Sequence, residues 1–155
     1  MNRGDILVKP HELTRYPGLI THLLNHPTMG VVVTREGNRL YMQGKKGTLV
    51  WDSGQVSVIG ENPLNMYGDP AIIAKQIADY AAVPETGDVM AFAIYENDST
   101  VDFNDKYTLI ALHGGLGGDQ NTPFMMYRPS SGLDPTKVLE AVELHEKFAA
   151  LRCRV

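Results

Sequence analysis

The sequence predicts an α/β (or α+β) fold, with a mixed sheet, about three helices and a small antiparallel meander subsheet. Apolar residues recur at three- and four-residue spacing in three separate segments, as they do in amphipathic helices. Short β-branched runs, separated by glycine-containing turns, fill residues 29–59. The chain has 155 residues and 43% hydrophobic residues, which suffices for one core. We therefore expect a single domain over residues 1–155.

Two of the helices have clear sequence boundaries. Within His11–Asn25, Pro17 and Gly18 mark the expected start of the first helix, and Asn25-His26-Pro27 ends it. The second helix is expected to begin at Asp69-Pro70, an N-cap acid followed by a proline in the first turn. Val83-Pro84 should end it, because the residue before a proline is disfavoured in a helix.

A terminal amphipathic helix is expected over residues 133–152, with Asp134 as its cap and Pro135 at its first position. Its apolar stripe includes Val142 and Phe148, and the rest of its surface is charged. The stripe could pack on the domain itself or on a second copy, so a homodimer through this C-terminal helix is one possible assembly.

The strands are indicated by alternating or continuous apolar runs. Four of them form the expected meander: Met29–Thr34, Arg39–Gln43, Thr48–Trp51 and Gln55–Ile59. A fifth run, Val89–Tyr95, is nearly continuous in hydrophobic residues, which is typical of a strand buried on both faces. We expect this fifth strand to be the centre of the fold.

Composition excludes several classes of partner and location. The net charge of −4 and the pI near 5.7 argue against a basic nucleic-acid-binding surface. The single cysteine, Cys153, has no partner for an internal disulfide, so a reducing compartment is expected. We find no apolar run of 18 residues and no signal-type segment, so we expect a soluble, cytoplasmic chain.

The most informative stretch is a glycine loop that follows an apolar run. The run Leu109–Leu112 ends at His113, and four glycines follow within five residues: Gly114, Gly115, Gly117 and Gly118. A hairpin needs only one or two glycines, so this loop is built to let its backbone approach another group closely. The run Phe124–Tyr127 should then lead back into the core. The alternative is a wide glycine-rich turn with a core or capping histidine.

Other candidate ligands are weaker. His22 and His26 lie four residues apart on the first predicted helix, a spacing that can bind a metal, but a partly exposed surface pair is the simpler interpretation. His145 is expected to be a helix-face residue. Asp102 and Asp105 are interpreted as turn-forming acids.

The glycine loop also carries a family resemblance. The matching residues are His113-Gly114-Gly115-Leu116-Gly117-Gly118-Asp119-Gln120-Asn121-Thr122-Pro123-Phe124. This stretch resembles the C-terminal metal-binding signature of bacterial proteins related to type I phosphodiesterase/nucleotide pyrophosphatase, in the alkaline phosphatase superfamily. Upstream segments occur in the same order and at similar spacing as in those proteins: Tyr16–Ile20, His26-Pro27, Gly30–Val33, Glu61–Leu64 and Tyr67-Gly68. The likeness covers roughly Glu12 to Tyr127.

The resemblance implies the C-terminal part of an alkaline phosphatase-like fold and a role for His113 as a ligand of one of two divalent metals, zinc or manganese. In such a centre two metals hold the attacking and leaving oxygens of a phosphodiester or nucleotide substrate. The residues placed near the substrate by this resemblance are Gly114, Gly115, Gly117, Gly118, Gln120 and Thr122.

The sequence also departs from the family. The nucleophilic Thr or Ser, its metal-binding Asp and the later Asp-His-Gly motif of those enzymes have no counterpart here. One histidine is too few for a catalytic zinc, which usually takes three protein ligands. We therefore expect no catalytic residue in this chain, which would be an inactive C-terminal fragment of a larger, membrane-associated or soluble hydrolase. The alternative is a stand-alone, non-catalytic binding or dimerisation module derived from the same family.

Overall fold

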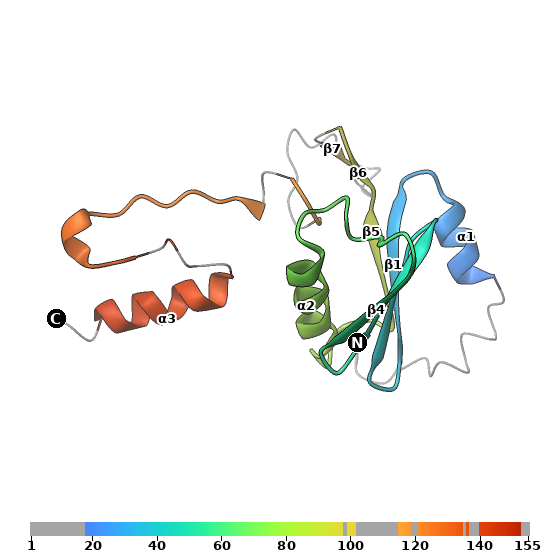
Figure 1. Cartoon of the computed structure of the whole chain (residues 1–155), viewed down its shortest axis with the longest axis horizontal. Coiled ribbons are helices and arrows are strands. Elements are labelled where there is room, and N and C mark those ends of the chain that lie inside the picture. Colours follow the sequence, from blue (N-terminus) through green and yellow to red (C-terminus); the bar gives the residue numbers. More distant parts are fainter. Residues whose placement is uncertain are drawn as a thin grey trace, which may run out of the picture. The chain divides into compact units, whose positions relative to one another are not determined.

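The computed structural model describes residues 18–97, 99–101, 115–118, 121–134, 136 and 140–152. The chain divides into two compact units, residues 1–122 and 123–155. Each unit is described separately below. The fold is α+β, as the sequence predicts: the described residues form three α-helices, a five-stranded antiparallel sheet and a two-stranded sheet (Figure 1).

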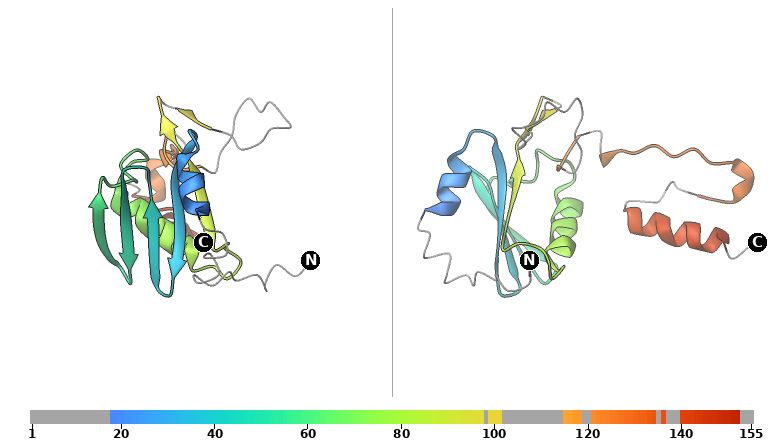
Figure 2. Two further views of the ribbon diagram at one scale, coloured as in Figure 1. Left: turned by 90° about the vertical axis from the view of Figure 1, so that its right-hand side faces the viewer. Right: turned by 180° about the vertical axis from the view of Figure 1, so that it is seen from behind.

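The main sheet of the first unit has the strand order β4-β3-β2-β1-β5 (Figure 2). Its strands are β1 (Met29–Glu36), β2 (Arg39–Gln43), β3 (Gly47–Asp52), β4 (Gln55–Gly60) and β5 (Val89–Ala93). The small sheet pairs β6 (Tyr95–Glu96) with β7 (Ser99–Thr100). The four meander strands are therefore confirmed. They form most of the main sheet, however, and every pairing in it is antiparallel among the described residues, so no separate subsheet is seen there.

Helices cover both faces of this sheet (Figure 1). Helix α1 (Leu19–Asn25) packs against β1 on one face, and α2 (Pro70–Ala81) lies on the other. The predicted boundaries of both helices are confirmed. Gly18 caps α1 with a φ of 83°, which a residue with a side chain rarely adopts. The Asp69 side chain accepts hydrogen bonds from the backbone N–H groups of Ala71 and Ile72, as expected of an N-cap.

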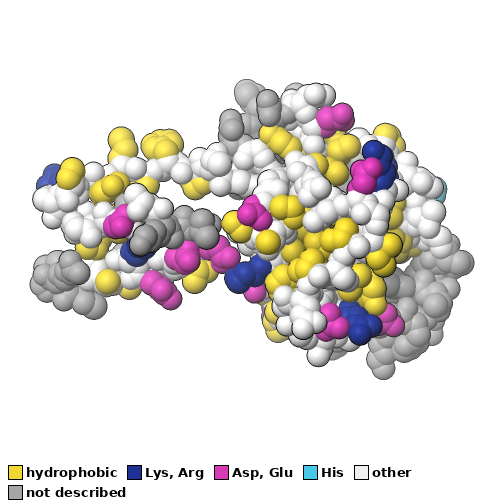
Figure 3. All heavy atoms as spheres, in the orientation of Figure 1, with side chains coloured by type: hydrophobic (Ala, Val, Ile, Leu, Met, Phe, Trp, Pro, Cys, Tyr) yellow, Lys and Arg dark blue, Asp and Glu magenta, His cyan; other side chains and the backbone are white. Residues whose placement is uncertain are grey.

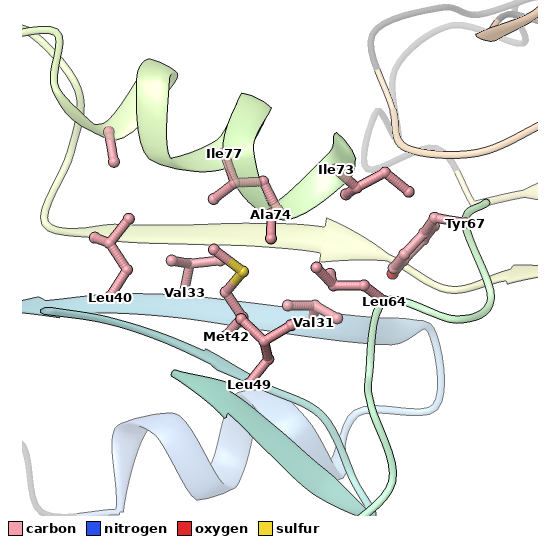
Figure 4. Close-up of a cluster of buried hydrophobic side chains, with 11 residues drawn as sticks. Val31, Val33, Leu40, Met42, Leu49, Leu64, Tyr67, Ile73, Ala74 and Ile77 are labelled. Atoms are coloured by element: carbon pink, nitrogen blue, oxygen red, sulfur yellow. The ribbon is translucent and has the colours of Figure 1, made fainter. Parts of the chain in front are cut away.

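The hydrophobic core lies between the sheet and α2 (Figure 4). Ile73, Ala74 and Ile77 of α2 point toward Val31 and Val33 of β1. The remaining members of the core come from the neighbouring strands, the loop after β4 and the end of α2: Leu40, Met42, Leu49, Leu64, Tyr67 and Ala81.

The expectation that Val89–Tyr95 forms the centre of the fold is wrong for the described part of the chain. The central strand is β1, whose first six residues are all buried, whereas every residue of β5 is half-buried or exposed. The physical reason is that α1 and α2 cover β1 from opposite faces. Among the described strands, β5 has a neighbour on one side only.

The second unit contains a 3₁₀ turn (Pro129–Ser131) and helix α3 (Ala141–Arg152). The described helix begins later than the predicted start at Asp134, because Glu140 is not helical and α3 starts at Ala141. The Asp134 carboxylate accepts hydrogen bonds from the N–H and hydroxyl of Thr136. These bonds lower the pKa of Asp134. Near the start of the helix, the Glu143 carboxylate accepts from the Glu140 N–H at 3.1 Å, as in half of a capping box.

Apolar side chains of the second unit are largely exposed. Phe124 and Met126, from the run that the sequence expects to lead back into the core, are both 88% exposed within this unit's description. On α3, Val142 is 68% exposed, and no residue of the helix is buried. No helix in the described ranges combines the length and apolar character that a membrane span requires.

Candidate functional site

The candidate site is built around a platform formed by the loop between β4 and α2. Pro63 and Leu64 of this loop are buried, and the Leu64 N–H donates to the Asn62 side chain at 3.0 Å. At the start of the loop, the Glu61 N–H donates to the backbone carbonyl of Lys46 at 3.2 Å. The loop is therefore fixed to the β2–β3 turn at one end and to the core in its middle.

Tyr67 joins this platform to β5. Its side chain is 3% exposed, and its hydroxyl donates a hydrogen bond of 2.7 Å to the backbone carbonyl of Ala93. Burial raises the pKa of the Tyr67 phenol, so the hydroxyl stays protonated and acts as a donor. Gly30 provides the space for it, because a Cβ at that position would collide with the hydroxyl. The geometry gives Tyr67 a structural role.

The described part of the glycine loop lies on this platform. A Cβ built on Gly117, which is buried, would lie 3.2 Å from the Tyr67 Cα and 3.1 Å from the Tyr95 ring. A Cβ on Gly118 would lie 2.9 Å from the same ring. The two glycines have φ values of 83° and 77°, in the left-handed region that favours glycine. The prediction that this loop makes close backbone contacts is therefore confirmed for Gly117 and Gly118.

A groove adjoins the loop between α2 and β5, with a volume of about 510 Å³. Leu116 lines it, together with Ile77 and Tyr80 of α2 and Met90 and Phe92 of β5. The described lining carries no charged side chain, and the hydroxyl of Thr86, which also lines the groove, donates to the Tyr80 carbonyl. The groove can therefore accept an apolar group, but its described lining offers no cation for a phosphate.

The predicted site residues are only partly within the described structure. His113, Gly114, Gln120, Asp102 and Asp105 lie outside it. Of the others, Gly117 and Gly118 lie against Tyr95, while Gly115 and Thr122 are exposed. The Gly118 carbonyl accepts from the Asn121 N–H at 3.0 Å, which closes the loop.

The other histidines do not form a metal site in the described structure. His26 is the C-cap of α1, and its Nδ1 lies 2.8 Å from the Thr28 hydroxyl. His22 and His145 are exposed on α1 and α3. Within the described ranges, no group of three or more His, Cys, Asp or Glu side chains is arranged to hold a metal ion.

Sequence reasoning did not identify Tyr67 and Tyr95 as site residues. In the sequence, Tyr67 belongs to one of the upstream segments of the resemblance, and Tyr95 is the end of an apolar run. The sequence offered a signal for Tyr95 only, which ends an apolar run and is followed by the polar residues Glu96-Asn97-Asp98; Tyr67 lies inside the loop between β4 and α2. Comparisons of the chain with protein-family models, curated proteins and solved structures found no match.

Proposed function

We propose that this chain is the C-terminal portion of a metal-dependent hydrolase similar to type I phosphodiesterases and nucleotide pyrophosphatases. It would contribute His113 as one metal ligand, and the glycine loop, residues 114–118, as the surface next to the substrate. The observation that carries the proposal is the contact of Gly117 with Tyr67. These residues belong to separate segments of the resemblance, and the fold brings the two segments together.

Two divalent metals, zinc or manganese, would supply the chemistry by stabilising the charge that develops on the attacking and leaving oxygens of a phosphodiester or nucleotide. The chain's own contribution is positional. The Tyr95 ring lies against Gly117 and Gly118, and the Tyr67 hydroxyl joins the platform to β5 by a hydrogen bond. Gly115 of the same loop is exposed and has no side chain, so a phosphate oxygen or a metal could approach the loop backbone closely at that position.

The described residues do not fit a complete metal centre, since they contain no cluster of three potential ligands. The proposal therefore assigns the remaining ligands and the nucleophile to other parts of the hydrolase. It follows that the isolated chain should not hydrolyse phosphodiesters and should bind no metal tightly.

The experiment is complementation. The chain is joined to an N-terminal portion that carries the nucleophile and the other ligands, and hydrolysis of bis-p-nitrophenyl phosphate is measured. We expect His113→Ala to reduce turnover by at least about 100-fold, because the loss of a metal ligand weakens the electrostatic stabilisation that the metals would supply. The matched control is His145→Ala, on the exposed surface of α3. Undiminished turnover in His113→Ala would reject the proposal.

The alternative is a stand-alone, non-catalytic module that binds a partner or dimerises. The exposed Val142 and Phe148 of α3 favour it, because 68% and 43% of these apolar side chains are accessible to solvent. Introducing Val142→Asp and Phe148→Asp together should then dissolve a dimer of the isolated chain. A monomeric unmodified chain would count against dimerisation through α3.

A further inference from the structure

Strand β4 is an unprotected edge of the main sheet. Among the described residues it pairs with β3 alone, and all six of its residues are exposed. Its sequence, Gln55–Gly60, contains no charged residue and no proline. Proteins usually protect exposed edges with charges, prolines or bulges, because a free row of N–H and C=O groups pairs readily with another strand.

The turn before β4 determines which backbone groups face the free edge. Ser53 and Gly54 both have positive φ values, 51° and 91°, which identifies a two-residue type I′ turn closed by Asp52 and Gln55. In such a hairpin the closing residues, Asp52 and Gln55, exchange backbone hydrogen bonds with each other. Along an antiparallel strand, residues whose backbone groups bond to the neighbouring strand alternate with residues whose backbone groups point away from it. The N–H and C=O groups of Val56 and Val58 are therefore directed away from β3, toward the free edge.

The side chains of these two residues lie on the face of the sheet that carries the core. Val56 pairs with Trp51, and Val58 pairs with Leu49, which belongs to the core. Val56 is 48% exposed and Val58 is 42% exposed. In Figure 3, hydrophobic side chains gather where α2 and β4 lie in Figure 1. The edge strand therefore offers backbone groups that can pair with another strand, and it carries two partly exposed valines on the face of the sheet that carries the core.

We propose that β4 is a dimerisation edge on which a second copy of this chain pairs antiparallel with the first, about a two-fold axis at Ser57. In this register Val56 of each copy lies opposite Val58 of the other, and these pairs exchange hydrogen bonds through their outward-directed backbone groups. Ser57 lies opposite Ser57 of the second copy. The strand is complementary to a second copy of itself, because the Val56 and Val58 side chains of both copies then lie in one row, on the face of the sheet that carries the core.

The charges near the ends of β4 do not oppose this pairing. Lys46 and Glu61 form an ion pair with a 3.5 Å separation beside one end of the strand, and Asp52, beside the other end, pairs at 2.8 Å with Arg39 of β2. Each of these charges has its partner within its own copy, and β4 itself carries no charged side chain. No like charges therefore oppose each other within the paired strands.

Cysteine cross-linking tests the register directly, using the full chain with Cys153→Ser. Ser57→Cys places two thiols opposite each other at a non-hydrogen-bonded position, where Cα atoms are about 4.5 Å apart and a disulfide can form. We expect this variant to oxidise to a species of twice 17.1 kDa. Ile59→Cys is the matched control: it is also exposed on β4 but lies opposite Gln55 in this register, so it should remain monomeric on a denaturing gel. Cross-linking through Val58→Cys instead would overturn the register.

The second measurement is the dimer dissociation constant, determined by sedimentation equilibrium on the chain without the introduced cysteines. Ser57→Lys places like charges opposite each other at the two-fold axis, and we expect it to weaken dimerisation by about five-fold or more. Circular dichroism checks that each variant is folded. A chain that is monomeric up to millimolar concentration, or a dimer that is unaffected by Ser57→Lys but lost in Val142→Asp/Phe148→Asp, would overturn the proposal. These results do not depend on phosphodiesterase activity, so they are separate from the test of the proposed function.

Discussion

The Tyr67 hydroxyl donates a 2.7 Å hydrogen bond to the backbone carbonyl of Ala93, and this bond joins the loop before α2 to the end of β5. The backbone of Tyr67 also lies against Gly117, and Tyr95, two residues beyond Ala93, lies against both Gly117 and Gly118. The described part of the glycine loop is thus positioned by two aromatic residues that are held at the same end of the sheet.

Removing the Tyr67 hydroxyl should lower stability. In Tyr67→Phe the half-buried Ala93 carbonyl loses its donor, and we expect the free energy of unfolding to fall by about 1 kcal/mol. Urea denaturation measures this change. Tyr80→Phe is the control, because Tyr80 is 58% exposed and should change stability by less than about 0.5 kcal/mol. Equal effects of the two substitutions would contradict the role of the bond.

Gly30→Ala should destabilise the first unit more strongly. The added methyl would collide with the Tyr67 hydroxyl and lie 2.9 Å from the Ala93 carbonyl oxygen, so we expect a loss of about 2 kcal/mol. In a Tyr67→Phe background the same substitution should cost less, because one of the colliding atoms is gone. Gly87→Ala is the control, since its nearest contact is an ordinary 3.6 Å. Additive effects of the Gly30 and Tyr67 substitutions would show that the two residues do not interact.

Gly118→Ala should displace the glycine loop from Tyr95. Its φ of 77° costs an alanine about 1–2 kcal/mol, and the new methyl would lie 2.9 Å from the ring. We expect faster hydrogen exchange at the Asn121 amide, which donates to the Gly118 carbonyl. Gly37→Ala shares the positive φ but meets no atom within 4 Å, so it separates backbone strain from the ring contact. An unchanged exchange rate at Asn121 would argue that the ring does not hold the loop.

The Arg39–Asp52 ion pair predicts a pH dependence. The Arg39 guanidinium donates to the Asp52 carboxylate at 2.8 Å and lowers the pKa of Asp52. A carboxyl group with a lowered pKa stabilises the folded state above its unfolded pKa, about 3.9, and this contribution disappears as the pH falls through the lower folded pKa. Asp52→Asn should therefore be slightly less stable than the parent chain at pH 7. The difference should vanish in denaturation experiments well below pH 4, and a difference that persists there would contradict the assignment.

Local signals in the sequence predicted much of the fold. The Asp69-Pro70 start of α2, the Gly18 boundary of α1 and the glycine turns of the meander each depend on a few adjacent residues, and the structure confirms them. The sequence places the start of the C-terminal helix at Asp134, whereas α3 begins at Ala141. The hydrogen bond from the Glu140 N–H to the Glu143 carboxylate marks this start, and neither glutamate stands out in a sequence with many acidic residues.

Features that depend on distant parts of the chain were not predictable in the same way. Both β1 and β5 are apolar, and only the packing of α1 and α2 on opposite faces makes β1 the buried centre. The contact of Gly117 with Tyr67 and Tyr95 likewise joins residues far apart in sequence. The pattern of glycines indicated a close approach, but it contained no information about which side chain the loop would meet.

The most direct test of the central claim is to isolate, with an antibody against this chain, the native protein that contains it, and to measure its mass and its hydrolysis of bis-p-nitrophenyl phosphate. The account predicts a mass well above 17.1 kDa and hydrolysis that is lost on chelation of divalent metals. A native protein of 17.1 kDa without this activity would contradict the account.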